Sequence, residues 1–253
     1  MFKEDFNAAS GAAAAKSSFL KKNPVGYFVL SVLAGMYIGF GILLSFTTGG
    51  LLAGEAAAKL AMGATFGVAL SLVVMAGSEL FTGNNMVMVA GLFKNKVTFA
   101  DCLVLWIVCW LGNMCGGVLL AILYHLTGLG NGTVGDFMAK TAMAKMSAPA
   151  IALLTRGILC NMLVCIAVWC GFRCKSESGK LIMIFWCLIA FFTTGFEHSV
   201  ANMTLLTYSL FNSAGQAVSL SGELYNLFWV TLGNMIGGIG LVAVPYFLSQ
   251  RDI

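Results

Sequence analysis

The string GFEHSVANM at Gly195–Met203 places a carboxylate and an imidazole, Glu197 and His198, inside an apolar stretch that runs from Leu181 to Leu210. An ionisable side chain at the centre of a bilayer costs on the order of 3 kcal/mol or more, so such groups are normally retained only where they line a cavity or a pathway. A similar string, GSELFTGNNM, occupies Gly77–Met86 in an earlier apolar stretch. The two strings predict where the chain departs from ordinary membrane helix.

The composition indicates an all-α membrane protein. The chain is 59% hydrophobic and 9% charged, whereas about 25% of residues are charged in a soluble domain. A membrane-spanning helix needs roughly 20 apolar residues. The long apolar stretches do not alternate polar and apolar residues as a membrane β-strand does. We therefore expect six helical spans at about Val25–Phe46, Ala56–Phe93, Ala100–Leu126, Ala148–Phe172, Leu181–Phe211 and Leu224–Leu248.

An internal repeat predicts an inverted architecture. WLGNMCGG at Trp110–Gly117 lies in the third span and TLGNMIGG at Thr231–Gly238 in the sixth, while the GSELFTGNNM and GFEHSVANM strings lie in the second and fifth. The chain is thus built as three spans plus three, and because three is odd the halves must insert in opposite orientations. Glycine and polar side chains within the long second and fifth stretches predict that these two helices are broken.

Broken helices of this kind favour the binding of an anion. Half-helices that begin near the bilayer centre expose unpaired N–H groups and about half a positive charge each. The glycines of the LGNM strings are better explained by close helix packing, within or between subunits, than by a phosphate cradle. No Walker A string is present, so this chain gives no support for ATP-driven transport.

Lysine and arginine gather on one side of the predicted membrane, the side that normally faces the cytoplasm. The opposite side carries Lys59, Lys140 and Lys145. We therefore expect both chain ends in the cytoplasm. The residues on the cytoplasmic side are Lys3, Lys16, Lys21, Lys22, Lys94, Lys96, Arg173, Lys175, Lys180 and Arg251.

The N-terminal segment, residues 1–23, is expected to form a helix on the membrane surface, followed by a six-helix unit over residues 24–250 of a single domain, 1–253. Phe6 and Phe19 would face inward, and Lys16, Lys21 and Lys22 would face anionic head groups. The alternative is that this segment is simply exposed to solvent and does not lie on the membrane.

His198 lies beside a predicted helix break, whereas the other histidine, His125, lies at the end of the third span. A buried imidazole is expected to be neutral and able to donate a hydrogen bond or a proton to an anion, with a packing role as the alternative. Glu197 would cap freed backbone N–H groups rather than face an anion that it repels. Thr82, in the first break, can donate to His198 or to a substrate oxygen.

Further candidate residues lie in or beside the predicted spans. Asn161 in the fourth span can hydrogen-bond across a cavity or only between helices. Lys145 can draw anions into a vestibule, although a generic surface lysine is the alternative. Phe66, Leu70 and Phe191 fall in the broken spans, where apolar side chains can close a pore by dewetting; core packing explains them equally well.

The eight cysteines form no CxxC pair. They are better explained as small apolar packing residues than as disulfides or metal ligands.

At these strings the chain resembles the formate/nitrite transporter family over essentially its whole length. The resemblance is carried by NPVGYFVLSVLAGMYIGFGI in the first span, MGATFGVALSLVVMAGSELFTGNNM in the second, LCNMLVCIAVW in the fourth, AFFTTGFEHSVANMTL in the fifth and LFWVTLGN in the sixth. The AGSELFTG and AKMSAPA strings are more similar to the nitrite branch than to the formate branch. Gly83–Asn84 departs from the GH that often follows FT in the nitrite branch.

The resemblance implies an aquaporin-like protomer in a homopentamer, with a pore in each protomer for small monovalent anions across the bacterial inner membrane. It implies nitrite as the leading substrate, with formate or hydrosulfide as the alternative, and it allows a role for protons. It implies no enzyme activity, no catalytic residue, no cofactor and no metal. The positive net charge gives no reason to invoke nucleic acid.

The resemblance also assigns residues. His198 matches the family's central pore histidine, Thr82 the threonine of the first break, Asn161 the asparagine facing that histidine and Lys145 the vestibule lysine. The matches to the constrictions are Leu70 with Leu80 or Phe81 on the cytoplasmic side, and Phe66 with Phe191 on the periplasmic side. The supporting residues are Glu79, Glu197 and Asn202.

Two other classes of protein share part of this pattern. A membrane redox enzyme would hold haem or an iron–sulfur cluster through grouped ligands, whereas His125 and His198 are far apart and no cysteine motif is present. A neutral-solute pore of the water or glycerol type would share the architecture but would not need Lys145 together with His198.

Overall fold

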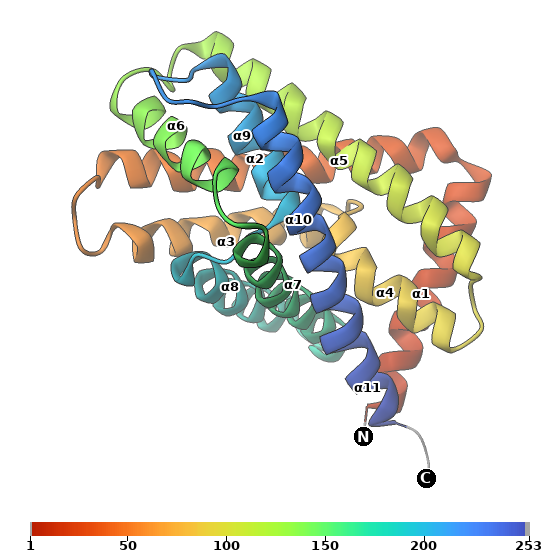
Figure 1. Cartoon of the computed structure of the whole chain (residues 1–253). Helices are drawn as coiled ribbons and strands as arrows, with labels where there is room; N and C mark the ends of the chain where they lie inside the picture. The colour runs from red at the N-terminus through yellow and green to blue at the C-terminus, as the bar shows by residue number, and fades with distance from the viewer. Residues whose placement is uncertain (1, 251–253) are drawn as a thin grey trace.

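The computed structural model describes residues 2–250, most of which are helical (Figure 1). Arg251, counted above on the cytoplasmic side, lies outside these residues. Within residues 2–250, six helical segments are long and apolar enough to cross a membrane, as the composition predicts. The elements are α1 (Lys3–Lys22), α2 (Pro24–Leu51), α3 (Ala58–Ala76), α4 (Phe81–Phe93), α5 (Phe99–Thr127), α6 (Thr133–Met146), α7 (Ala150–Arg173), α8 (Glu177–Thr194), α9 (Ser199–Phe211), α10 (Leu220–Gly238), the π-helical turn η1 (Ile239–Ala243) and α11 (Val244–Leu248).

The second and fifth spans are broken, as predicted, and a glycine ends the first half of each. Gly77 follows α3 with a φ of 79°, and Gly195 follows α8 with a φ of 83°. Only glycine adopts such angles without steric cost. The chain then resumes helix at Phe81 in α4 and at Ser199 in α9. Both short helices are buried over nearly their whole length, so their N-termini lie inside the protein.

The chain is an inverted repeat in which α1–α5 correspond to α6–α10. In the first half α2 packs along α5, and in the second half α7 packs along α10. A Cβ on Gly116 of α5 would overlap the carbonyl oxygen of Val32, and a Cβ on Gly237 of α10 would overlap that of Ile158. The LGNM glycines therefore allow helices within the subunit to approach closely, which is the packing role favoured above.

The helix α6 was not predicted, and it is the counterpart of α1. α1 packs on the short helix α4, and α6 packs on the short helix α9. This arrangement corrects the expectation that Lys16 faces lipid head groups, because Lys16 forms an ion pair with Glu79 beneath α1. Phe6 of α1 is buried, as expected.

The start of α1 and the end of the last helix lie side by side at one end of the bundle (Figure 1). The rings of Phe2 and Tyr246 are 5.7 Å apart, and those of Phe6 and Phe247 are 5.9 Å apart. Both ends of the described chain are therefore on the same side of the six spans.

Candidate functional site

The two helix breaks meet where His198 contacts Thr82. His198 is the N-cap of α9, and its Nδ1 accepts a hydrogen bond from the backbone N–H of Ala201 at 3.1 Å. In a neutral ring the proton therefore sits on Nε2, which lies 3.1 Å from the Oγ1 of Thr82 in α4. Both side chains are buried. The backbone of α9 thus directs the Nε2–H toward the Thr82 oxygen, and the Thr82 hydroxyl hydrogen is left for another acceptor.

An asparagine from the first LGNM string fixes the break before α4. The Oδ1 of Asn113 accepts the backbone N–H of Phe81 at 2.9 Å. Its Nδ2 donates to the carbonyl oxygens of Ser31 and Glu79 at 2.7 and 2.9 Å. One amide side chain thereby satisfies backbone groups that the broken helix leaves without partners.

Asn234 does the same for α9 in the inverted half. Its Oδ1 accepts the backbone N–H of Ser199 at 2.9 Å, and its Nδ2 donates to the carbonyl oxygens of Gly157 and Glu197 at 2.8 and 2.9 Å. Sequence reasoning considered only the glycines of the two LGNM strings. The signal it overlooked is the asparagine that occupies the same place in both.

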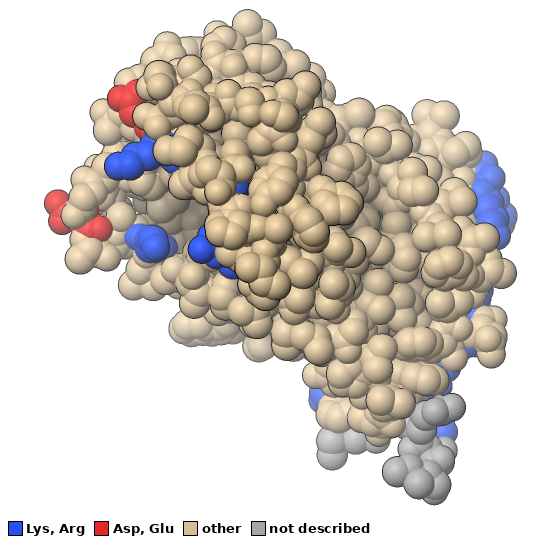
Figure 2. Space-filling model, in the orientation of Figure 1, with Lys and Arg blue, Asp and Glu red and all other residues tan. Residues whose placement is uncertain are grey.

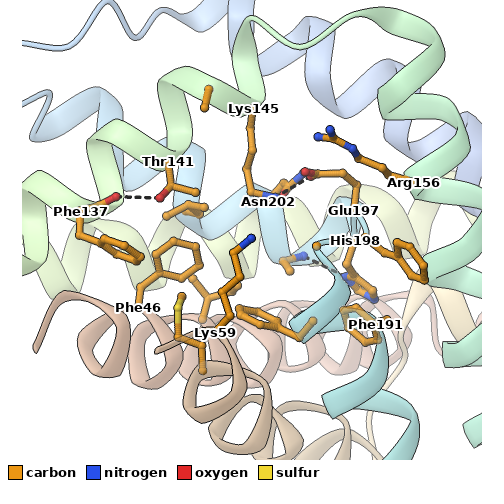
Figure 3. Close-up of a pocket in the computed structure, with 18 residues that line it drawn as sticks. Phe46, Lys59, Phe137, Thr141, Lys145, Arg156, Phe191, Glu197, His198 and Asn202 are labelled. Atoms are coloured by element: carbon orange, nitrogen blue, oxygen red, sulfur yellow. Dashed lines mark hydrogen bonds and ion pairs between the residues drawn. The ribbon is translucent and has the colours of Figure 1, made fainter. Parts of the chain in front are cut away.

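A cavity of about 420 Å³, here called the Lys145 vestibule, opens on one side of His198 (Figure 3). Lys145 Nζ donates to Glu197 Oε2 at 2.6 Å, and Asn202 Nδ2 donates to the same oxygen at 2.7 Å. Asn226 accepts from Asn202 at 2.8 Å and donates to the carbonyl oxygen of Lys145 at 3.0 Å. This closed ring of hydrogen bonds holds the ion pair at the vestibule wall.

Glu197 pairs with a cation, and this finding corrects its expected role. We expected its carboxylate to cap backbone N–H groups of the break, but the structure gives that role to Asn234 and His198. Two further cations, Lys59 and Arg156, line the same vestibule. Figure 2 shows Lys and Arg side chains around a hollow in the surface, on the left of the view. Arg156 lies within the fourth span, and the sequence-based comparison of loop charges left it out.

A second cavity of about 400 Å³, here called the Lys16 vestibule, lies on the opposite side of the breaks. Lys16 Nζ donates to both carboxylate oxygens of Glu79, at 2.6 and 2.7 Å. Tyr27 Oη and Asn84 Nδ2 donate to Oε2 of Glu79 at 3.1 and 2.9 Å. This group is the inverted counterpart of the hydrogen-bonded ring around Lys145.

Lys16 is a site residue that sequence reasoning missed. Its place in the repeat becomes visible only when α6 is recognised as the partner of α1, because Lys16 and Lys145 then occupy matching helices. Each lysine pairs with the glutamate of one helix break. The symmetry therefore identifies Lys16 as the counterpart of Lys145.

Apolar side chains separate the two vestibules. Phe66 and Phe191 meet edge to face at 5.6 Å between ring centroids, and Phe191 stacks on the His198 ring at 6.0 Å. Leu80 lines the gap, whereas Phe81 is buried next to it. The gap has no room for a water molecule and is lined by Ile38, Phe66, Leu70, Leu80, Val164, Leu188, Phe191 and His198.

Asn161 contacts the backbone near the breaks and forms no hydrogen bond with His198 within residues 2–250. Its Nδ2 lies 3.2 Å from the carbonyl oxygen of Thr82 and 2.7 Å from that of Asn234. The same nitrogen lies 3.0 Å from Oδ1 of Asn85. Asn161 thus joins the first turn of α4 to α10.

Known relatives cover nearly the whole chain. The family described as formate/nitrite transporter matches residues 3–248. The chain is 41% identical over 253 residues to the nitrite transporter NirC of Escherichia coli (strain K12), covering 98% of this chain and 92% of that protein. It is 30% identical over 256 residues to the formate channel FocA of the same strain, covering 91% of this chain and 90% of that protein.

Two solved structures share the fold. One, titled "FNT family ion channel", superposes with a TM-score of 0.95 at 40% identity, covering 99% of this chain and 100% of that chain. The other, a pentameric formate channel with formate bound, gives a TM-score of 0.81 at 26% identity, covering 92% and 99% of the two chains. The fold, the paired helix breaks and these matches agree, and the chain belongs to the formate/nitrite transporter family.

Proposed function

We propose that this protein conducts small monovalent anions, with nitrite as the leading substrate, through a pore within each protomer. Formate or hydrosulfide is the alternative substrate. The observation that carries the proposal is the contact between His198 and Thr82 at the gap between the two vestibules. The relatives named as nitrite transporters and formate channels support the same class of substrate.

The gap offers hydrogen-bond donors to an anion. The hydroxyl of Thr82 can donate to an oxygen of nitrite, and the Nε2–H of His198 can donate to the same anion when it is released from Thr82 Oγ1. Bonds to an ionised acceptor are stronger than bonds to a neutral one. The N-termini of α4 and α9 add positive potential at the same place. No acidic side chain is among the residues that line the gap in the described chain. Hydrogen-bond donation alone makes passage passive, whereas proton-coupled passage would need His198 to take up a second proton and then pass one proton to the anion as the ring returns to its neutral form.

Apolar side chains form two constrictions beside His198. Phe66 and Phe191 close the gap toward the Lys145 vestibule, and Leu70 with Leu80 close it toward the Lys16 vestibule. A narrow apolar passage stays dry and blocks hydrated ions until its side chains move. We assign these four residues to gating.

The lysine of each vestibule places a cation beside the pathway. Lys145 and Lys16 are each fixed by a glutamate, so their ammonium groups are held in one position rather than sampling many. A fixed cation in a concave mouth raises the local concentration of anions. Glu79, Glu197 and Asn202 support the pathway by holding these cations.

The setting that we propose is the cytoplasmic membrane of a bacterium, with both chain ends in the cytoplasm and the Lys145 vestibule facing outward. The excess of lysine and arginine on the side of the chain ends supports this orientation. The pentameric formate channel of the same fold supports assembly as a homopentamer.

Uptake of nitrite, formate, hydrosulfide and chloride into proteoliposomes tests the proposal. We expect nitrite to lead the series. We also expect Thr82→Val to lower nitrite uptake by about tenfold, as for the loss of a hydrogen bond to a charged group. His198→Ala should lower it at least as far, because it removes the donor itself.

Thermal unfolding separates function from folding in this assay. Thr82→Val keeps the His198 cap on α9, so its thermal unfolding temperature should stay close to that of the wild type. Flux led by formate or hydrosulfide would move the function to the alternative substrate. Water or glycerol flux without anion flux in folded protein would contradict the proposal.

A further inference from the structure

The Lys145 vestibule is much larger than its proposed substrate needs. Its volume of about 420 Å³ lies within the range of roughly 300–1,000 Å³ that encloses drug-sized organic ligands, whereas nitrite has three heavy atoms. Much of the wall is aromatic, with Phe46, Phe137, Phe192 and Phe196 among the lining residues. The cavity therefore has the size and the lining to take a ring.

The aromatic rings form a connected surface that leads toward the constriction. Phe137 lies 5.8 Å from Phe46, Phe46 lies 6.3 Å from Phe192, and Phe192 lies 4.7 Å from Phe66, measured between ring centroids. Aromatic rings favour edge-to-face and offset contacts at these separations. A further ring in the vestibule can make the same contacts with this surface.

Two cations of the vestibule have no acidic partner within residues 2–250. Lys145 is paired with Glu197, but neither Lys59 of α3 nor Arg156 of α7 forms an ion pair, and both are exposed. Figure 3 shows both side chains reaching toward the cavity from different helices. An arginine fork matches a carboxylate in geometry as well as in charge. These two residues can therefore hold the anionic end of a ligand whose ring lies on the phenylalanines.

We infer that the Lys145 vestibule is a binding site for aromatic monocarboxylates, with the ring against Phe46, Phe137 and Phe192 and the carboxylate on Arg156 or Lys59. A ligand of this size cannot enter a gap that has no room for water, so it stays in the vestibule and plugs the pore from that side. Binding does not depend on the proposed function, whereas the block of nitrite flux rests on it.

The opposite vestibule lacks this combination. Lys16 is held in an ion pair by Glu79, and within the described residues no further basic residue lines the Lys16 vestibule. Phe172 is the aromatic residue among those that line it. The site is therefore confined to one mouth of the pore, and block by an aromatic carboxylate is expected from one side of the membrane.

Binding of 2-naphthoate to the purified full-length protein, measured by calorimetry without nitrite, tests the inference. The double variant Arg156→Gln/Lys59→Gln should weaken binding by about tenfold or more, as for the loss of charge-assisted hydrogen bonds. Lys140→Gln removes a cation that is exposed on α6 outside the lining, and it should leave binding unchanged.

The ligand itself provides the matched controls. The neutral 2-naphthamide should bind at least about tenfold more weakly because it lacks the charge, and acetate should bind weakly because it lacks the ring. Equal binding of naphthoate and naphthamide, or equal binding to the wild type and the double variant, would overturn the inference. Naphthoate binding in protein that shows no nitrite flux would sustain the site while removing the proposed function.

Discussion

At the scale of single residues, we assign His198 a structural and a chemical task, one for each nitrogen of its ring. Nδ1 caps α9 through Ala201, and this bond leaves Nε2 to carry the proton toward Thr82. The cap therefore orients the donor that we assign to the anion.

Asn234 is predicted to be essential for the second break. Its replacement by leucine, of similar size, would leave the N–H of Ser199 and the carbonyl oxygens of Gly157 and Glu197 buried without partners. Each orphaned group costs about 1–3 kcal/mol. We expect Asn234→Leu to lower the unfolding temperature of purified protein markedly, and the exposed Asn131→Ala to leave it unchanged. An unchanged unfolding temperature in Asn234→Leu would refute this role.

The pair of Lys145 and Glu197 allows stability and transport to be separated. Lys145→Met leaves a buried carboxylate unpaired and should destabilise the protein by about 3 kcal/mol. The double variant Lys145→Met/Glu197→Met removes both charges and should recover much of that stability without recovering nitrite flux. Thermal unfolding and flux, measured on the same preparations, check this. Recovery of flux in the double variant would show that the Lys145 cation is not needed.

At the scale of elements, the six spans and the two breaks could be predicted, because apolar length and embedded glycine are local signals in the sequence. The helix α6 and the inward direction of Lys16 could not. α6 carries several polar residues and matches no membrane span, and α1 reads as amphipathic whichever surface its polar side faces. The acidic partner of Lys16 is Glu79, which lies 63 positions further along the chain. The local sequence pattern around Lys16 does not encode that contact.

The packing between α2 and α5 gives an element-scale prediction. A Cβ on Gly116 would overlap the backbone of Val32, which cannot move aside as a flexible side chain can. Gly116→Ala should therefore reduce the yield of monodisperse protein in size-exclusion chromatography. A Cβ on Gly171 of α7 meets no atom within 4 Å, so Gly171→Ala is the matched control and should behave as the wild type. Equal yields from the two variants would contradict the packing account.

At the scale of the whole molecule, the inverted repeat builds two similar mouths around one dry gap. Each half supplies a broken helix, a glutamate, a paired lysine and a capping asparagine, but the halves differ at the N-cap of the short helix. The place of His198 in one half is taken by Leu80 in the other, since both are N-caps of a short helix. One half therefore places an imidazole at this N-cap, and the other half places an apolar side chain there.

The most direct test of the pathway is nitrite uptake by intact cells that carry a single added cysteine in one mouth, treated with a negatively charged, membrane-impermeant thiosulfonate. Thr141 lines the Lys145 vestibule and Ser78 lines the Lys16 vestibule. The account predicts that external reagent blocks Thr141→Cys, that a reductant restores its flux, and that Ser78→Cys and the wild type are unaffected. Unchanged flux in fully modified Thr141→Cys would contradict a pathway through the Lys145 vestibule, and external block of Ser78→Cys would reverse the orientation.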